Sequence, residues 1–116
     1  MSITRYEAGT RMSQAVVHGN TVYLAGQVAA DYNGTIEKQT TEVLAAVDKL
    51  LAQAGTSKSK LLTIQVIVNN IGDFAAMNTV YDAWIDPANP PTRACIEARL
   101  AHPALKVEVI AVAALD

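Results

Sequence analysis

The sequence has little of what many catalytic and cofactor sites require. Its 116 residues include one cysteine, two histidines and six scattered glycines. A single cysteine cannot form an internal disulfide, and isolated histidines give no spacing typical of a metal site. Scattered glycines provide no phosphate-binding loop. These shortages argue against a disulfide-stabilised domain, a metal centre and a nucleotide cofactor, so we expect a protein without cofactors.

Positive charge and long apolar runs are also scarce. Nine Lys and Arg residues stand against eleven Asp and Glu, and the isoelectric point is near 5.6. Nucleic-acid binding usually needs a concentrated basic surface, which this chain lacks. The longest apolar run, residues 109–115, is far shorter than the roughly 18 residues of a membrane span, and the first ten residues do not resemble a secretion signal. We expect a cytoplasmic protein that binds neither nucleic acid nor membranes.

Periodicity predicts one α+β domain over residues 1–116. Helical spacing of apolar residues, followed by Gly55, predicts a helix from Ile36. A second helix is expected from Asp73 to Asp86-Pro87, with Phe74 and Tyr81 on its apolar stripe. Strands are expected at residues 3–6, 14–18, 21–28, 61–69, 92–100 and 107–114. The order β-β-β-α-β-α-β-β predicts a mostly antiparallel sheet with two helices on one face.

The last two predicted strands are separated by a short break at Ala101-His102-Pro103, which suggests a hairpin. Opposite charges favour one register of such a pair over another. The favoured register places Glu97 opposite Lys106 and Cys95 opposite Glu108. Arg93 would then lie diagonally from Glu108, roughly 7–8 Å away on the same face. The sequence thus predicts a patch that contains a cation, a thiol and a carboxylate.

Glu108 is unusual because the same strand face continues as Ile110, Val112 and Ala114. A carboxylate among apolar neighbours is costly unless it is paired or used. The simplest explanation is a salt bridge with Arg93 or Lys106. The functional explanation is that the patch forms a binding site, in which Arg93 clamps a small carboxylate through two parallel hydrogen bonds. The strand pattern leaves both explanations open.

The final strands carry apolar residues on both faces, whereas two helices can cover only one face of the sheet. A second copy of the chain is the simplest cover for the other face. The pattern therefore predicts an oligomer.

Several motifs together resemble a known family. Pro91-Thr92-Arg93-Ala94-Cys95 is followed, fifteen residues after the arginine, by Glu108 within Lys106-Val107-Glu108-Val109. Upstream, in the expected order, come Ser13-Gln14-Ala15-Val16, Gly26-Gln27-Val28 and residues 73–78, Asp-Phe-Ala-Ala-Met-Asn. These motifs resemble those of the Rid family, the YjgF-like reactive intermediate deaminases, over nearly the whole chain.

The resemblance implies a trimer of a chorismate-mutase-like fold with ligand clefts between subunits. It also implies hydrolysis of a short 2-imino acid, or its enamine tautomer, to a 2-keto acid and ammonia without a cofactor. Arg93 would hold the substrate carboxylate, and Glu108 would orient the attacking water. Main-chain groups near Gly26 and Cys95 would hold the imine end, and Asn78 is a further binding candidate.

Two departures from the family pattern affect substrate choice. Many Rid proteins have Gly-Pro-Tyr before Ser-Gln-Ala, where this chain has Thr-Arg-Met ending at Met12, and Ala25 replaces a residue that often carries a hydroxyl. The alternative function is therefore a non-catalytic trimer that binds small carboxylates or acts as a regulator. Some relatives are ribonucleases, but this chain lacks the basic surface and the pair of histidines that such an activity would use. Cys95 has no predicted base, and Glu108 opposite it would raise the thiol pKa, so we expect it to shape the site.

Overall fold

The computed structural model describes residues 2–116 and contains one seven-stranded sheet and two α helices. The helices are α1 (Ile36–Ala54) and α2 (Phe74–Trp84), and each 3-10 turn, η1 (Lys58–Lys60) and η2 (Ile71–Asp73), precedes a longer element. The strands are β1 (Ile3–Tyr6), β2 (Ala15–His18), β3 (Thr21–Leu24), β4 (Gln27–Val28), β5 (Leu61–Val68), β6 (Thr92–Glu97) and β7 (Val107–Ala114). The predicted α+β order is confirmed, except that the strand predicted at residues 21–28 is divided into β3 and the two-residue β4.

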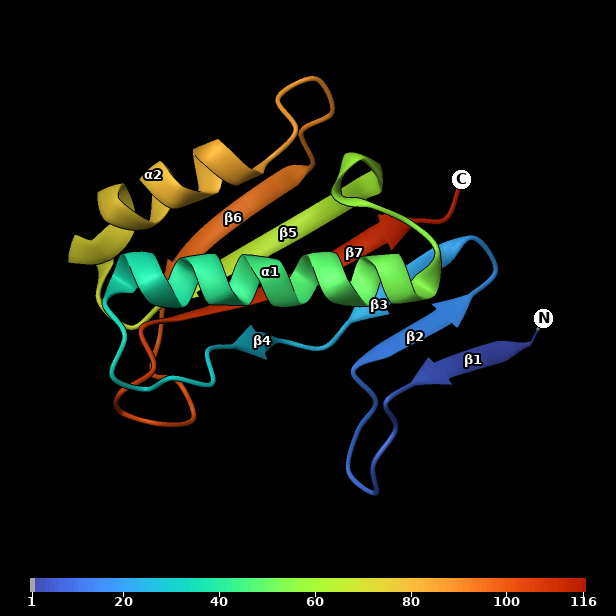
Figure 1. Ribbon diagram of the computed structural model, residues 1–116, viewed down its shortest axis with the longest axis horizontal. Coiled ribbons are helices and arrows are strands. Elements are labelled where there is room, and N and C mark those ends of the chain that lie inside the picture. The colour runs from blue at the N-terminus through green and yellow to red at the C-terminus, as the bar shows by residue number, and fades with distance from the viewer. Residues whose placement is uncertain (1) are drawn as a thin grey trace.

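The strands lie in the order β1-β2-β3-β7-β5-β6, and β4 pairs with β7 beyond the end of β3. Every pair is antiparallel except β5 and β6, which run parallel because α2 carries the chain back between them. Both helices lie on the same face of the sheet (Figure 1). We call this the helix-covered face and the opposite one the open face.

The predicted hairpin between the last two strands is wrong. Strand β5 lies between β6 and β7 and pairs with both of them. After β6 the chain continues along β5, where the Ala98 amide donates to the Val68 carbonyl, and it then crosses the end of β5 to begin β7. A strand that is apolar on both faces suits a central position, and β7 takes one beside β5 rather than beside its neighbour in sequence. The predicted pairs Glu97–Lys106 and Cys95–Glu108 do not form.

Helix α1 supplies the largest share of the cover over the sheet. Thr35 accepts a hydrogen bond from the Lys38 amide at the first turn, and Gly55 ends the helix with φ 91°, a left-handed conformation that suits glycine. The predicted apolar stripe is buried, with Val43, Val47 and Leu51 fully inaccessible to solvent. The core therefore lies between the helices and the helix-covered face.

The alternation of buried and exposed residues along β5 is interrupted at its first residues. Ile64 is fully buried, yet Leu62, two residues earlier, is 50% exposed, and the buried residue at the start of the strand is Leu61, at 6%. The pairing with β7 shifts between Leu61 and Thr63, as in a β-bulge, and the extra residue reverses the faces that precede it.

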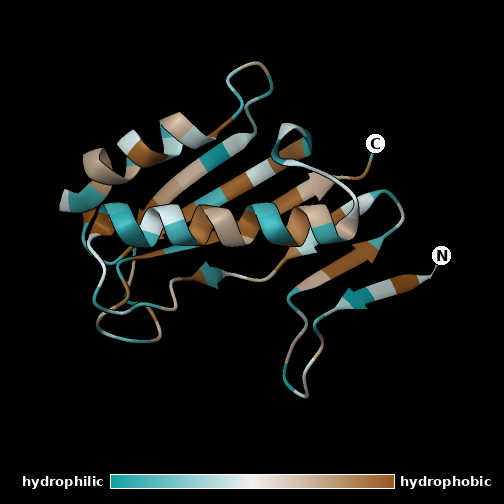
Figure 2. Ribbon diagram, in the orientation of Figure 1, coloured by the Kyte–Doolittle hydropathy of each residue, from teal (hydrophilic) through white to brown (hydrophobic). Residues whose placement is uncertain are grey.

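The open face is apolar at its centre and has no cover within residues 2–116. The register places Ile67, Ile110 and Val112 on this face, and Tyr23 beside Val112 is 49% exposed. Figure 2 shows the apolar residues that run along β7 and parts of β5. Such a face is typical of a surface that another chain covers. None of the described helices has the length and hydropathy needed to cross a bilayer.

Candidate functional site

Arg93 lies on the edge strand β6 and points to the helix-covered face, because its register partner Ile64 is fully buried on that face. One guanidinium nitrogen donates a hydrogen bond of 2.6 Å to the Asn78 side-chain oxygen. The guanidinium carbon lies 4.7 Å from the ring centroid of Tyr81 and 5.8 Å from that of Phe74. The half-buried cation is thus held against α2 by an amide and two aromatic faces.

Helix α2 can supply all three contacts because Phe74, Asn78 and Tyr81 follow an i, i+4, i+7 spacing, which places them on one helix face. The sequence identified Asn78 as a candidate but assigned Phe74 and Tyr81 to the apolar stripe alone. Their position relative to Asn78, four residues before it and three after it, is the sequence signal that could have identified Phe74 and Tyr81 as its neighbours. Burial raises the pKa of Tyr81, while Arg93 opposes the rise and Asp82 adds to it.

Cys95 lies two residues after Arg93 on the same face of β6, opposite Val66. Burial raises the pKa of its thiol, and the nearby Arg93 partly offsets the rise. The thiol therefore stays protonated at neutral pH, which suits packing better than nucleophilic attack. Burial is the main cause; the predicted opposing position of Glu108 is wrong.

Glu108 lies on the open face of β7, where it pairs with Ile67 of β5 and Val28 of β4. Its side chain is half-buried and runs close to Gly26. A Cβ at Gly26 would lie 2.8 Å from the Glu108 carboxyl carbon, a distance that real side chains do not adopt. The absence of a side chain at Gly26 therefore makes room for the carboxylate.

Arg93 and Glu108 point to opposite faces of the sheet within one chain. Arg93 pairs with Ile64, which shares the helix-covered face with Ala111, whereas Glu108 pairs with Ile67 on the open face. The predicted diagonal contact of roughly 7–8 Å is wrong, since that distance holds only for residues on adjacent strands of one face. A salt bridge between Arg93 and Glu108 of the same chain is excluded for the same reason.

The other positions considered from the sequence are dispersed. Met12 lies in the exposed segment between β1 and β2, and Ala25 follows β3 directly before Gly26. His18 and His102 are exposed, and His102 stacks on Tyr32. In the part of the chain that the structure describes, no group of three or more histidine, cysteine or acidic side chains could hold a metal ion.

Comparison with known proteins covers almost the entire chain. Residues 2–115 match the family model described as Endoribonuclease L-PSP. The chain is 41% identical to a RutC family protein of Haemophilus ducreyi over 98% of this chain and 97% of that protein. It is 37% identical to the RutC family protein YoaB of Escherichia coli over 99% and 100% of the two chains.

Solved structures agree with the sequence comparison. A member of the YjgF protein family from Neisseria meningitidis superimposes with a TM-score of 0.97 at 37% identity, covering 100% of this chain and 97% of that one. An uncharacterized protein from Pseudomonas aeruginosa gives a TM-score of 0.96 at 39% identity, covering 99% and 100%. A Mycobacterium tuberculosis member of the YjgF/YER057c/UK114 family gives 0.87 at 25% identity, covering 97% and 99%. The chain therefore belongs to the YjgF/YER057c/UK114 family, the Rid family that its motifs resemble.

Proposed function

We propose that this protein hydrolyses short 2-imino acids, and their enamine tautomers, to 2-keto acids and ammonia. The observation that carries the proposal is that the charge of Arg93 is held in place but not neutralised by an acidic side chain within the described residues. Its half-buried guanidinium is held by Asn78 and two aromatic rings, and Asn78 is its one side-chain hydrogen-bond partner among residues 2–116. A neutral amide orients the cation without cancelling its charge, so the free edge of the guanidinium is available to a substrate carboxylate.

Glu108 is the proposed group that handles water. Its carboxylate orients a water molecule and accepts a proton as the oxygen bonds to the imine carbon. The same proton passes to the nitrogen, which gives a carbinolamine. Glu108 then takes the hydroxyl proton of this intermediate and delivers it to the nitrogen, so the carbon–nitrogen bond breaks, ammonia leaves and the carbonyl forms. The whole sequence consumes one water and requires no oxidant, reductant or metal. Membership of a family that includes imine deaminases supports this chemistry.

The proposed site needs two subunits. Arg93 and Glu108 lie on opposite faces of one sheet, so a substrate of a few atoms cannot touch both within one chain. We propose a homotrimer in which Arg93, Cys95 and Asn78 of one subunit meet Gly26 and Glu108 of its neighbour. The apolar open face around Ile67, Ile110 and Val112 supports such an assembly because it lacks cover within the described chain.

Main-chain groups complete the proposed site. The main-chain groups near Gly26 and Cys95 hold the imine nitrogen. Because Gly26 lies close to the Glu108 carboxylate, the imine is held beside the water that Glu108 orients. Met12 and Ala25 stand where many relatives carry hydroxyl groups, so this site offers fewer hydrogen bonds to the substrate. That reduction favours small substrates without polar side chains.

The smaller number of hydrogen bonds to the substrate also favours a second candidate function. This candidate is a non-catalytic trimer that binds small carboxylates through Arg93. The name of the matching family model suggests an endoribonuclease. A net charge of −2 does not attract RNA, and the two histidines are exposed, so neither feature supports that activity here. Turnover of an imine separates the first candidate from the second.

The deciding experiment generates 2-iminobutyrate or 2-iminopropionate in situ with an amino-acid oxidase and follows release of the keto acid. We expect the protein to accelerate release over buffer alone, and Arg93→Ala to lose the acceleration. Arg5→Ala, which changes an exposed arginine on the edge strand β1, is the matched control and should remain active. Binding of 2-oxobutyrate without any acceleration would establish the non-catalytic candidate instead.

A further inference from the structure

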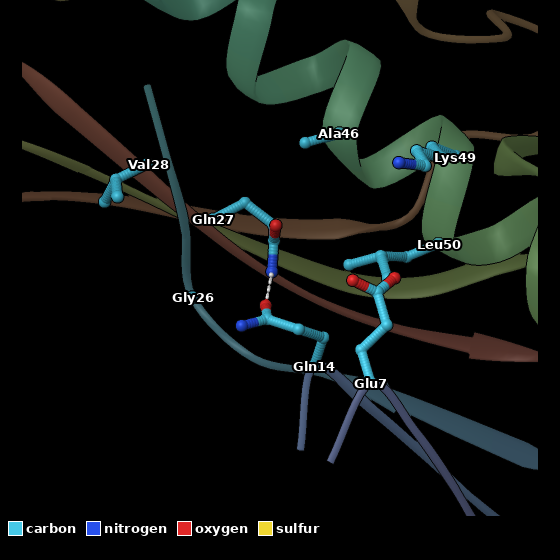
Figure 3. A pocket seen from close by; sticks show the side chains of 8 residues that line it. All are labelled: Glu7, Gln14, Gly26, Gln27, Val28, Ala46, Lys49 and Leu50. Atoms are coloured by element: carbon cyan, nitrogen blue, oxygen red, sulfur yellow. Dashed lines mark hydrogen bonds between the residues drawn. The ribbon is translucent and has the colours of Figure 1, made fainter. Parts of the chain in front are cut away.

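A cavity of about 310 Å³ lies between α1, β4 and the segment that joins β1 to β2 (Figure 3). Its walls include Gln27 and Leu50. Gln27 pairs with Val109, whose side chain is buried on the helix-covered face, whereas Glu108 lies on the open face. The cavity therefore lies on the helix-covered side at Gln27, and it borders the surroundings of Glu108 only along Gly26 and Val28.

The cavity presents one negative and one positive group. Glu7 extends from the segment after β1 toward α1, and the Lys49 amine projects from α1 beside the same space (Figure 3). Leu50 and Ala46 supply an apolar wall between these polar groups. A ligand that carries both charges at a short separation fits this arrangement better than a simple anion or cation, since each of those would meet one group of like charge.

Two amides add further polar groups. The Gln27 Nε2 atom donates to the Gln14 Oε1 atom and to the Ala25 carbonyl, each at 3.0 Å. Both of its hydrogens are thus engaged, while the Gln27 Oε1 acceptor and the Gln14 Nε2 donor have no side-chain or backbone partner within the described chain. Both glutamines are part-buried and line the cavity, so these free groups are available to a ligand.

The backbone at Glu7 is an independent sign of a specialised position. Its φ of 50° is left-handed, a conformation that non-glycine residues seldom adopt. Hydrogen bonds fix the segment, from the Gln14 amide to the Tyr6 carbonyl at 3.1 Å and from the Gly9 amide to the Met12 carbonyl at 2.9 Å. Unusual backbone conformations that the surroundings maintain are concentrated at functional sites.

We propose that this cavity binds a free α-amino acid. Glu7 receives the ammonium group, Lys49 and the Gln14 amide nitrogen receive the carboxylate, and Gln27 Oε1 accepts a second ammonium hydrogen. The ligand side chain lies against Leu50, and the volume limits it to a small or medium size. The groups that bind the amino acid are distinct from Arg93 and Glu108, although Gly26 borders both sites, and binding does not depend on the reaction proposed for Arg93 and Glu108.

The test is a titration of the assembled protein with L-alanine, followed by NMR of its backbone and side-chain amides. Saturable shifts are expected for the side-chain amides of Gln14 and Gln27 and for residues 46–50. Ethylamine and propionate, which each carry one of the two charges, should bind at least about tenfold more weakly, since each loses a charged hydrogen bond. Equal binding of propionate would reveal an anion site and overturn the proposal.

Variants complete the test. Glu7→Gln and Lys49→Met change exposed side chains and should each weaken L-alanine binding by about tenfold or more. Glu37→Gln and Lys38→Met, at exposed positions near the start of α1, are the matched controls. Arg93→Ala should bind L-alanine normally, which distinguishes this site from the proposed deaminase site. Absence of saturable binding, unchanged affinity in Glu7→Gln and Lys49→Met, or shifts confined to residues around Arg93 would overturn the proposal.

Discussion

At the scale of single residues, Arg93 is the side chain whose surroundings are hardest to explain by packing alone. Its charge is oriented by α2 but not neutralised there. Arg93→Ala should therefore weaken binding of pyruvate or 2-oxobutyrate by about 100- to 1,000-fold, because a charge-assisted bidentate contact is lost. Calorimetric titration of the folded oligomer measures this change. Normal affinity in the variant would remove Arg93 from the site.

Glu108→Gln should have a different effect. The amide keeps the shape beside Gly26 but cannot accept a proton from water, so carboxylate binding should survive while imine hydrolysis falls about 100-fold. The comparison requires KM and kcat measured separately, with thermal unfolding of the same samples as the control. Full turnover per folded site would contradict the proposed role of Glu108.

Cys95 should be dispensable for catalysis. Burial raises the pKa of its thiol, so little thiolate exists at neutral pH. Cys95→Ala should keep most of the activity, and alkylation of wild-type Cys95 should be slower than that of a free thiol and should accelerate only as pH rises above the ordinary thiol pKa. Complete inactivity of a folded Cys95→Ala variant would instead assign chemistry to the sulfur.

At the scale of elements, α2 positions the cation on β6. Asn78→Ala removes the 2.6 Å hydrogen bond and should raise KM for a 2-imino acid by about tenfold, with a smaller effect on kcat. Tyr81→Phe retains the ring face beside Arg93 and serves as the control, with little change expected. A reduction in stability without any change in KM would limit Asn78 to a structural role.

Local signals predicted the individual elements well, whereas the pairing of distant strands escaped them. Helical spacing and Gly55 defined α1, because these features depend on neighbouring residues. The pairing of β7 with β5 depends on long-range packing, and a register chosen from charges alone placed Glu97 opposite Lys106 incorrectly. The sequence thus identified Arg93 and Asn78, which lie in contact. The register predicted from it placed Glu108 on the same face as Arg93, which is wrong.

At the scale of the whole molecule, apolar side chains on both faces of the central strands predicted a need for a second copy, and the open face retains that character. The opposite orientation of Arg93 and Glu108 makes the assembly part of the proposed chemistry. If each site combines Arg93 of one subunit with Glu108 of its neighbour, inactive variants should complement one another.

Mixed oligomers provide the measurement. Arg93→Ala and Glu108→Gln subunits, unfolded together in equal amounts and refolded, should assemble at random. A site is intact when the subunit that supplies Arg93 is a Glu108→Gln chain and its neighbour is an Arg93→Ala chain, so about one quarter of the wild-type activity should return. Each variant refolded alone should stay inactive, and sedimentation should find trimers in all three samples. Inactive mixed trimers would show that both residues must come from one chain, which the opposite faces of the sheet do not allow, and the proposed site would then be abandoned.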